Sequence, residues 1–371
     1  MNLSELLETL LKDAQKHLSK PFVADADIQQ KVEFICRCNT NKAPIRFLLA
    51  CLLAKMDRPD TDIRKPYTEI GGGDAYSGRK YDEAYITHFA DLHKLPCNST
   101  TAFLTPAFRN INRVLTTDLN LEGKPKEVYA FALSLLDSVH RKAALPEILM
   151  KEFLRILLII RDENESRMKQ LLAGLNRGDD GPTLSSEQIL TLLEQHLRCK
   201  NSSRLPVLMI VAAYTAVEQA LGEKALPLQS HNAADKQTGS LGDVEIQLTD
   251  DNSLVSCYEM KDKRVSINDI NQALAKISNA GSRIDNYIFI TTDLIEAEVA
   301  EYAKSVFEKT GIELVVLDCL GFVRHYLHFF HRHRFAFLDT YQKLVLNEPN
   351  SSVGQPLKEA FLILRKQAES N

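Results

Sequence analysis

The stretch "SLGDVEIQLTDDNSLVSCYEMKDKRVS", Ser240–Ser266, predicts two short strands joined by a polar turn. Apolar and polar residues alternate on both sides of the turn, which is typical of paired antiparallel strands. A turn centred on Asp251 sets the register. The predicted pairs are Leu248 with Leu254, Ile246 with Ser256, Val244 with Tyr258, and Asp243 with Glu259. The face expected to be buried carries Val244, Ile246, Leu248, Leu254, Tyr258 and Met260.

Three ionisable residues lie on the opposite face of this hairpin, namely Asp243, Glu259 and Lys261. Directly opposed residues have Cβ atoms about 4.5–5.5 Å apart, so the two carboxylates repel each other unless a cation lies between them. Mg2+ commonly binds one or two carboxylates together with phosphate and water. The Lys261 ammonium would orient an attacking water and neutralise the scissile phosphate. The pattern predicts metal-dependent phosphodiester hydrolysis, and a solvated hairpin is the alternative.

The segments after the hairpin alternate between helix and strand. Ser266-Ile267-Asn268-Asp269 resembles a capping box and opens a helix. The predicted elements are a helix to about Asn279, a strand Tyr287–Thr292, a helix Glu296–Lys309, a strand Ile312–Leu317 and a final helix from near Leu320. This order predicts an α/β (α+β) fold with a mixed sheet covered by helices.

Asp243 with Glu259-Met260-Lys261, on consecutive strands followed by a helix, resembles the PD-(D/E)xK nuclease core. This core is the fold of most type II restriction endonucleases. The resemblance implies that Asp243 and Glu259 hold Mg2+ and that Lys261 assists the water. The proline that often precedes the aspartate is replaced by Gly242.

Two further carboxylates are auxiliary candidates for this site. The resemblance covers roughly Glu218 to Leu317, and many nucleases of this superfamily place a glutamate on the helix before the hairpin. Glu218 in "YTAVEQALG" has that position, with a plain surface glutamate as the alternative. Glu245 shares the face of Asp243 and is the second candidate.

Residues 1–175 are expected to form a mainly helical N-terminal domain. Apolar residues spaced by three and four predict the helices Leu3–Leu18, Ile28–Cys38, Pro44–Lys55, Lys126–Arg141 and Glu147–Ile160. A linker, "GLNRGDDGPTLSSE" at Gly174–Glu187, separates this domain from helices Glu187–Leu197 and Leu205–Leu221. The expected nuclease domain spans residues 185–335, and residues 336–371 form a C-terminal helical extension.

A long non-periodic segment interrupts the N-terminal helices, and its part Lys65–Asn112 is the candidate DNA-recognition loop. Gly71, Gly72 and Gly73 allow a tight turn or a close approach to a partner. Arginine pairs with guanine and asparagine with adenine in the major groove. The candidate DNA-binding residues are Arg79, Lys80, Tyr81, Asn98, Arg109 and Asn110. The alternative is an elaborate surface loop held by its own hydrogen bonds.

As strings, "YTEIGGGDAYSGRKYDE" and "LPCNSTTAFLTPAFRN" resemble type II restriction endonucleases of the SacI kind. That resemblance covers most of the chain. It implies cleavage of double-stranded DNA at a palindromic hexanucleotide, GAGCTC in the namesake, and pairing with a cognate DNA methyltransferase. A palindromic target calls for a twofold-symmetric homodimer.

Composition and other motifs exclude several classes of protein. The net charge of −4 gives no global basic field, so a histone-like binder is not expected. The seven cysteines lack a CxxC pair and are expected to be free thiols in a reducing bacterial cytoplasm. No apolar run is long enough for a membrane span. The Pro-Cys of "LPCN" lacks the glycine-rich cofactor loop of a cytosine methyltransferase.

Three alternatives to an active restriction endonuclease stay open. The first is a sequence-specific DNA-binding protein with an inactive nuclease fold, and the second is another PD-(D/E)xK DNA-processing nuclease. The third is a helical interaction protein whose acidic hairpin face is only solvated. The intact Asp243, Glu259 and Lys261 set disfavours the first, and the arginines, asparagines and tyrosines of the loop disfavour the third.

Overall fold

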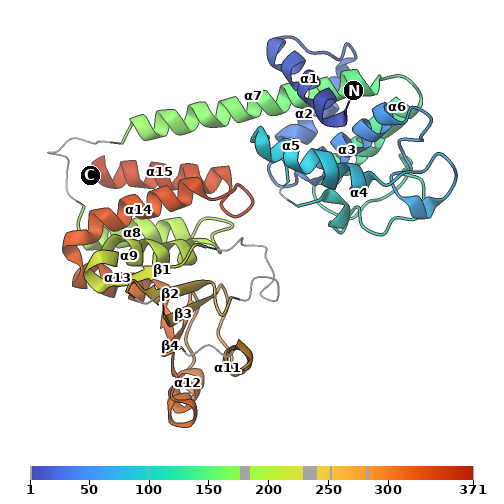
Figure 1. Cartoon of the computed structure of the whole chain (residues 1–371). Coiled ribbons are helices and arrows are strands. Elements are labelled where there is room, and N and C mark those ends of the chain that lie inside the picture. Colours follow the sequence, from blue (N-terminus) through green and yellow to red (C-terminus); the bar gives the residue numbers. More distant parts are fainter. Residues whose placement is uncertain are drawn as a thin grey trace. The chain divides into compact units, whose positions relative to one another are not determined.

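The computed structural model describes residues 2–98, 100–175, 184–228, 240–250, 253–280 and 284–370. The chain forms two compact units, Met1–Lys169 and Gln170–Asn371 (Figure 1). The first unit is helical, whereas the second contains the sheet. Within the described ranges, no helix is both long and apolar enough to cross a membrane.

Helices build the core of the first unit around α3. The main helices are α1 (Leu3–Lys16), α2 (Ala26–Arg37), α3 (Ala43–Asp57), α6 (Lys126–His140) and α7 (Pro146–Ala173). Every residue of α3 from Ala43 to Ala54 is buried, because this span is apolar on all sides except at Arg46, which is ion-paired. The predicted helices are confirmed, but α7 continues to Ala173 instead of ending at Ile160. The extra turns are polar, so apolar periodicity does not reveal them, and helix-forming residues sustain them.

The segment between α3 and α6 is largely folded rather than structureless. It contains η1 (Thr68–Ile70), α4 (Gly78–Tyr81), η2 (Asp82–Ile86), α5 (Thr87–Leu92) and η3 (Ala102–Leu104). A buried ion pair anchors it to α3, since Arg46 Nε lies 2.8 Å from Asp82 Oδ1 and the two side chains are 2% and 0% exposed. Its short turns lack a repeating apolar pattern, which is why the sequence shows no helices there.

A five-stranded mixed sheet forms the centre of the second unit (Figure 1). Its strands are β1 (Glu223–Ala225), β2 (Val244–Leu248), β3 (Leu254–Lys261), β4 (Asn286–Thr291) and β5 (Glu313–Asp318), in that spatial order. The first two pairings are antiparallel, and β3, β4 and β5 are parallel. The mixed sheet is confirmed and is compatible with a PD-(D/E)xK core. Strand β1 was not expected, because it has only three residues.

The register of the hairpin is confirmed near the predicted site and wrong near the turn. Val244 pairs with Tyr258, and Ile246 pairs with Ser256. A bulge then shifts the register, so Leu254 pairs with Gln247 rather than with Leu248. The predicted turn centre, Asp251, lies outside the described residues.

Helices cover both faces of this sheet. On the apolar face, α9 (Leu205–Leu221) meets β3, where the Tyr214 and Tyr258 hydroxyls lie 2.8 Å apart. The same layer includes α8 (Ser186–Leu197), α13 (Cys319–Phe329), α14 (Arg334–Asn347) and α15 (Gln355–Ser370). On the other face, α11 (Ile267–Ala280) and α12 (Ala297–Thr310) share a core with Cys257 and Tyr287.

The expectation of a single buried face is therefore wrong. Cys257 is fully buried on the face expected to be polar, because α11 and α12 cover it. On the apolar face Val244, Ile246 and Tyr258 are buried, while Leu248, Leu254 and Met260 are half-buried. The charged residues of the hairpin thus lie at the margin of a covered surface, where water is partly excluded.

Candidate active site

The structure brings together Asp243, Glu259 and Lys261 at one edge of the sheet. Asp243 directly precedes β2, and the other two residues end β3. Asp243 Oδ2 accepts a hydrogen bond from the Met260 backbone N at 2.7 Å. Lys261 Nζ lies 3.0 Å from Glu259 Oε1. The register that pairs Val244 with Tyr258 produces this meeting, because it aligns the start of β2 with the end of β3.

Both oxygens of Glu259 have cationic or polar neighbours. Lys261 lies beside Oε1, while Lys276 Nζ from α11 lies 3.7 Å from Oε2. The Tyr287 hydroxyl lies 3.3 Å from the same Oε2 and 2.9 Å from the Leu241 backbone oxygen. The Glu259 side chain is 17% exposed. These neighbours compensate the charge of a carboxylate that is largely removed from water.

Asp243 experiences opposing electrostatic effects. It is exposed to solvent, but the surrounding protein restricts water near its carboxyl, and this desolvation is the main cause of its raised pKa. The hydrogen bond from Met260 lowers the pKa of Asp243, and the negative charge of Glu259 raises it. Arg204 and Lys261 lower it by smaller amounts. A cation placed between the two carboxylates would relieve their repulsion.

Lys261 remains a cation in this setting. Burial works to lower the pKa of Lys261, but Glu259 and Asp269 outweigh that effect and raise the pKa above its usual value. Asp269 Oδ1 lies 3.5 Å from Lys261 Nζ. The lysine therefore holds a positive charge between the carboxylates of Glu259 and Asp269, one residue after Met260, which donates to Asp243.

The residues Asp269, Lys276 and Tyr287 were missed as site residues by sequence reasoning. Asp269 had a sequence signal only as part of the capping box, which is confirmed by hydrogen bonds from Ser266 N and to Ser266 Oγ. Lys276 and Tyr287 gave no signal, because their contacts with Glu259 depend on how α11 and β4 pack against β3.

A cavity of about 890 Å³ opens beside Asp243 and Lys261. Its floor includes Asp243 and the carboxyl ends of three parallel strands, at Lys261, Thr291 and Asp318. The carboxyl edge of parallel strands is a common place for ligands in α/β folds. Other lining residues come from the end of α8, the α8–α9 turn and the start of α9.

The donor set fits a hard divalent cation with few protein ligands. Among the residues that the structure describes, no group of three or more His, Cys, Asp or Glu side chains is placed to hold a metal ion. Asp243 and Glu259 supply two carboxylates, and Mg2+ commonly takes no more than one or two, together with water and phosphate. The mutual repulsion that contributes to the raised pKa of Asp243 is the feature that such a cation would remove.

The two auxiliary candidates occupy different places. Glu245 Oε1 accepts hydrogen bonds from Leu241 N at 2.7 Å and from Ser240 Oγ at 3.1 Å, so it fixes the backbone that leads into Asp243. Glu218 lies near the C-terminal end of α9, whereas Pro206 at the other end of that helix lines the cavity. Twelve helical residues correspond to about 18 Å, so the structure does not bring Glu218 to the site.

Part of the predicted DNA-binding set gathers around a second cavity, in the first unit. This cavity of about 380 Å³ is lined by Arg79 and Asn110, together with Glu69 and Asn112. Arg79 is half-exposed and pairs with Glu83 at 2.7 Å. The cavity therefore presents charged and amide side chains from both ends of the candidate recognition loop.

The remaining residues of that set differ in whether their side chains have partners within the protein. Lys80 and Arg109 are exposed. Tyr81 donates a hydrogen bond to Asp57 Oδ2 at 2.5 Å, and the Asn98 side chain donates to the Thr100 backbone oxygen at 3.1 Å. The last two side chains thus have partners within the protein that stabilise the loop.

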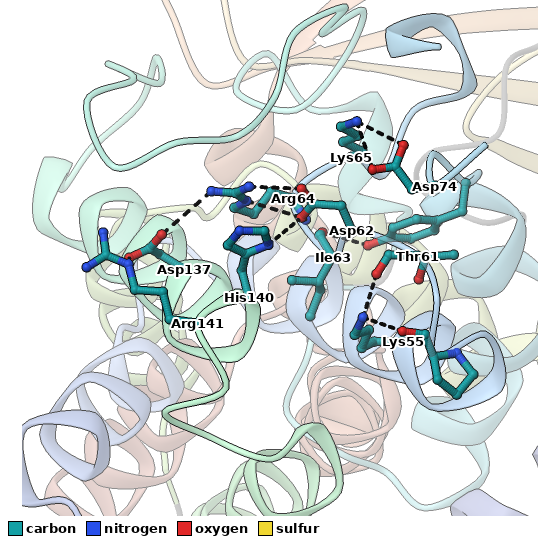
Figure 2. Close-up of polar contacts among 12 residues, drawn as sticks. Lys55, Thr61, Asp62, Ile63, Arg64, Lys65, Asp74, Asp137, His140 and Arg141 are labelled. Atoms are coloured by element: carbon teal, nitrogen blue, oxygen red, sulfur yellow. Dashed lines mark hydrogen bonds and ion pairs between the residues drawn. The ribbon is translucent and has the colours of Figure 1, made fainter. Parts of the chain in front are cut away.

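Polar contacts hold the base of the glycine turn (Figure 2). Lys65 Nζ contacts both carboxylate oxygens of Asp74, at 2.8 and 2.9 Å, across the turn that contains the glycines. Next to it, Asp62 binds Arg64 at 2.9 Å and His140 of α6 at 3.2 Å. Gly71 and Gly72 have φ values of 77° and 90°, which favour glycine. These contacts therefore hold the two ends of the glycine turn in a fixed position.

Comparison with known proteins identifies the second unit. Residues 183–292 match the family model of the SacI restriction endonuclease C-terminal domain. The matched range includes Asp243, Glu259 and Lys261 and extends from α8 through β4. No curated protein matches the chain. The chain therefore carries the C-terminal domain of the SacI-like restriction endonucleases, which makes it a nuclease that acts on DNA.

Proposed function

We propose that this nuclease is a type II site-specific endonuclease that makes Mg2+-dependent double-strand breaks at a palindromic hexanucleotide. The observation that carries the proposal is that Asp243 and Lys261 line one cavity, while Glu259 contacts Lys261 at 3.0 Å. The SacI-like domain supports GAGCTC as the first sequence to test. A palindrome favours a homodimer in which each subunit cuts one strand.

In the proposed reaction, Asp243 and Glu259 would hold Mg2+ at the edge of the sheet. When bound, the ion would activate water and stabilise charge on the phosphate. Lys261 remains protonated, binds a phosphate oxygen and orients the water on the same side. Tyr287 keeps the Glu259 carboxylate in place through its Oε2.

Base reading is proposed for the cavity of the first unit. Arg79 suits guanine, and the asparagines at 110 and 112 suit adenine. Glu69 can accept from the cytosine amino group. The fixed base of the glycine turn supports this role, since a recognition surface needs a stable geometry.

The test is digestion of unmodified phage DNA with the purified protein and Mg2+. Wild type is expected to give discrete fragments that end at one sequence, while Asp243→Ala gives none. DNA methylated by the methyltransferase that the cell pairs with this nuclease should resist cutting. Absence of cutting by wild type with either Mg2+ or Mn2+, together with retained specific binding, would support the inactive nuclease fold instead.

A further inference from the structure

The cavity beside Asp243 and Lys261 has a second wall that the proposed reaction does not use. This wall comes from the C-terminal end of α8 and the turn that joins it to α9. Its lining residues include Glu194, Leu197, Arg198, Asn201, Ser202 and Ser203. Asp243, Lys261 and this turn therefore face one common space of about 890 Å³.

The turn presents hydrogen-bond donors to that space. The Arg198 side chain is 74% exposed, and its partner is Glu194, at 2.6 Å on the preceding helical turn. Asn201 and Ser203 are also exposed. Ser202 differs, because its hydroxyl donates to the Leu197 backbone oxygen at 2.7 Å and so closes the end of α8.

The chemistry of this wall fits a nucleic-acid backbone. Arginine, serine and asparagine side chains make many of the contacts to phosphate oxygens in protein–DNA complexes. An exposed ion pair between residues four positions apart on a helix, such as Arg198–Glu194, contributes little to stability, so Arg198 can exchange Glu194 for a phosphate. Phosphates recur about every 3.4 Å of helix axis along one strand, so a strand with one phosphate at Asp243 carries further phosphates close to the same cavity.

We propose that the α8–α9 turn binds the sugar–phosphate backbone of the strand being cut, through Arg198, Asn201 and Ser203. The bound group is a phosphodiester next to the scissile one. This inference rests on the proposed function of the cavity, and it adds a substrate-binding surface to the cavity that Asp243 and Lys261 line. Arg198 supplies the positive charge, whereas the asparagine and serine supply neutral donors.

The test measures DNA binding as a function of salt. A fluorescein-labelled duplex taken from a cleaved phage fragment is bound in Ca2+ to wild type, Arg198→Ala and Asn201→Gly. Arg198→Ala is expected to weaken binding about tenfold and to reduce the slope of log K against log salt by about 1. Asn201→Gly is expected to weaken binding without changing the slope. Glycine keeps the left-handed backbone, where Asn201 has φ 63°.

Two further variants make the result decisive. Lys309→Ala removes an exposed charge from the last turn of α12, outside the cavity lining, and is expected to leave affinity and slope unchanged. The double variant Arg198→Ala with Glu194→Gln is expected to show the same reduced slope of log K against log salt as Arg198→Ala alone. Full recovery in that double variant would mean that Glu194 repels DNA, and it would overturn the inference.

Unchanged affinity and slope in Arg198→Ala, or equal losses in Lys309→Ala, would also contradict it. In cleavage assays, Arg198→Ala is expected to raise KM more than it lowers kcat, as loss of uniform binding does. A wild type that binds DNA but never cuts it would refute the proposed function. In that case the labelled duplex is taken from uncut phage DNA. The salt slope of Arg198→Ala then tests whether the turn binds phosphate, independently of cleavage.

Discussion

Asp269 contacts both a helix terminus and the candidate catalytic lysine. Its Oδ2 lies 2.9 Å from Ser266 N and completes the capping box of α11, while its Oδ1 lies 3.5 Å from Lys261 Nζ. The start of α11 is thereby coupled to the end of β3. One carboxylate fixes where the helix begins and keeps a cation beside Glu259.

We predict that Asp269→Asn changes the pH dependence of cleavage while the cap persists. Asparagine can still accept from Ser266, but it no longer raises the pKa of Lys261. Lys261 then loses its proton at lower pH than in wild type, so the alkaline limb of kcat/KM moves to lower pH. The measurement is a pH profile of kcat/KM, and superimposable alkaline limbs would refute the coupling.

Lys276→Met is predicted to strengthen binding of Mg2+. The lysine competes with a bound cation for Glu259 Oε2, so its removal should lower the metal concentration at half-maximal cleavage. Lys276→Arg retains the charge and serves as the matched control. Calorimetric titration of Mg2+ into each protein measures the affinity for the metal directly, without DNA cleavage. Weaker metal binding by the methionine variant would contradict this account.

The ion pair between Arg46 and Asp82 is predicted to stabilise the segment that carries the recognition loop. Asp82→Ala leaves a buried guanidinium without its carboxylate and should lower the free energy of unfolding by about 3–5 kcal/mol. Arg46→Met combined with Asp82→Leu should recover much of that loss, since no charge then remains buried. Urea denaturation compares the variants, and a single variant as stable as wild type would exclude this anchoring role.

Arg79→Ala is predicted to relax the choice of DNA sequence. If Arg79 reads a guanine, its loss should cost about 1–3 kcal/mol of discrimination at one base pair. Arg58, an exposed arginine just after α3, provides the control variant. Sequencing of fragment ends from a randomised library gives the preference at each position. An unaltered preference in Arg79→Ala would remove this residue from base reading.

Local patterns explain how much of the sheet could be predicted from the sequence. Alternation between Val244 and Leu248 and between Leu254 and Met260 reports a strand directly, so the pairing of Val244 with Tyr258 follows from one assumed turn. The bulge after Ile246 breaks the strict alternation rule, and nothing in the local pattern marks it.

Tertiary packing explains what could not be predicted. Whether the face of Glu259 meets water or a helix depends on where α11 packs, and that placement uses contacts distant in sequence. The α8–α9 turn precedes Asp243 by about forty residues, and only the folded chain places both on one cavity. The sequence showed Asp269 as a helix cap because capping involves residues close in sequence. Its contact with Lys261 depends on how α11 packs against β3, so the sequence did not show it.

The rate of DNA cleavage by Lys261→Ala, relative to Lys263→Ala, tests the central claim most directly. Both lysines follow Glu259 on the chain, but Lys261 contacts that carboxylate at 3.0 Å, whereas Lys263 is exposed. The account predicts that Lys261→Ala slows single-turnover cleavage by about 100-fold or more with little change in DNA binding, and that Lys263→Ala cuts at the wild-type rate. Equal rates for the two variants would contradict it.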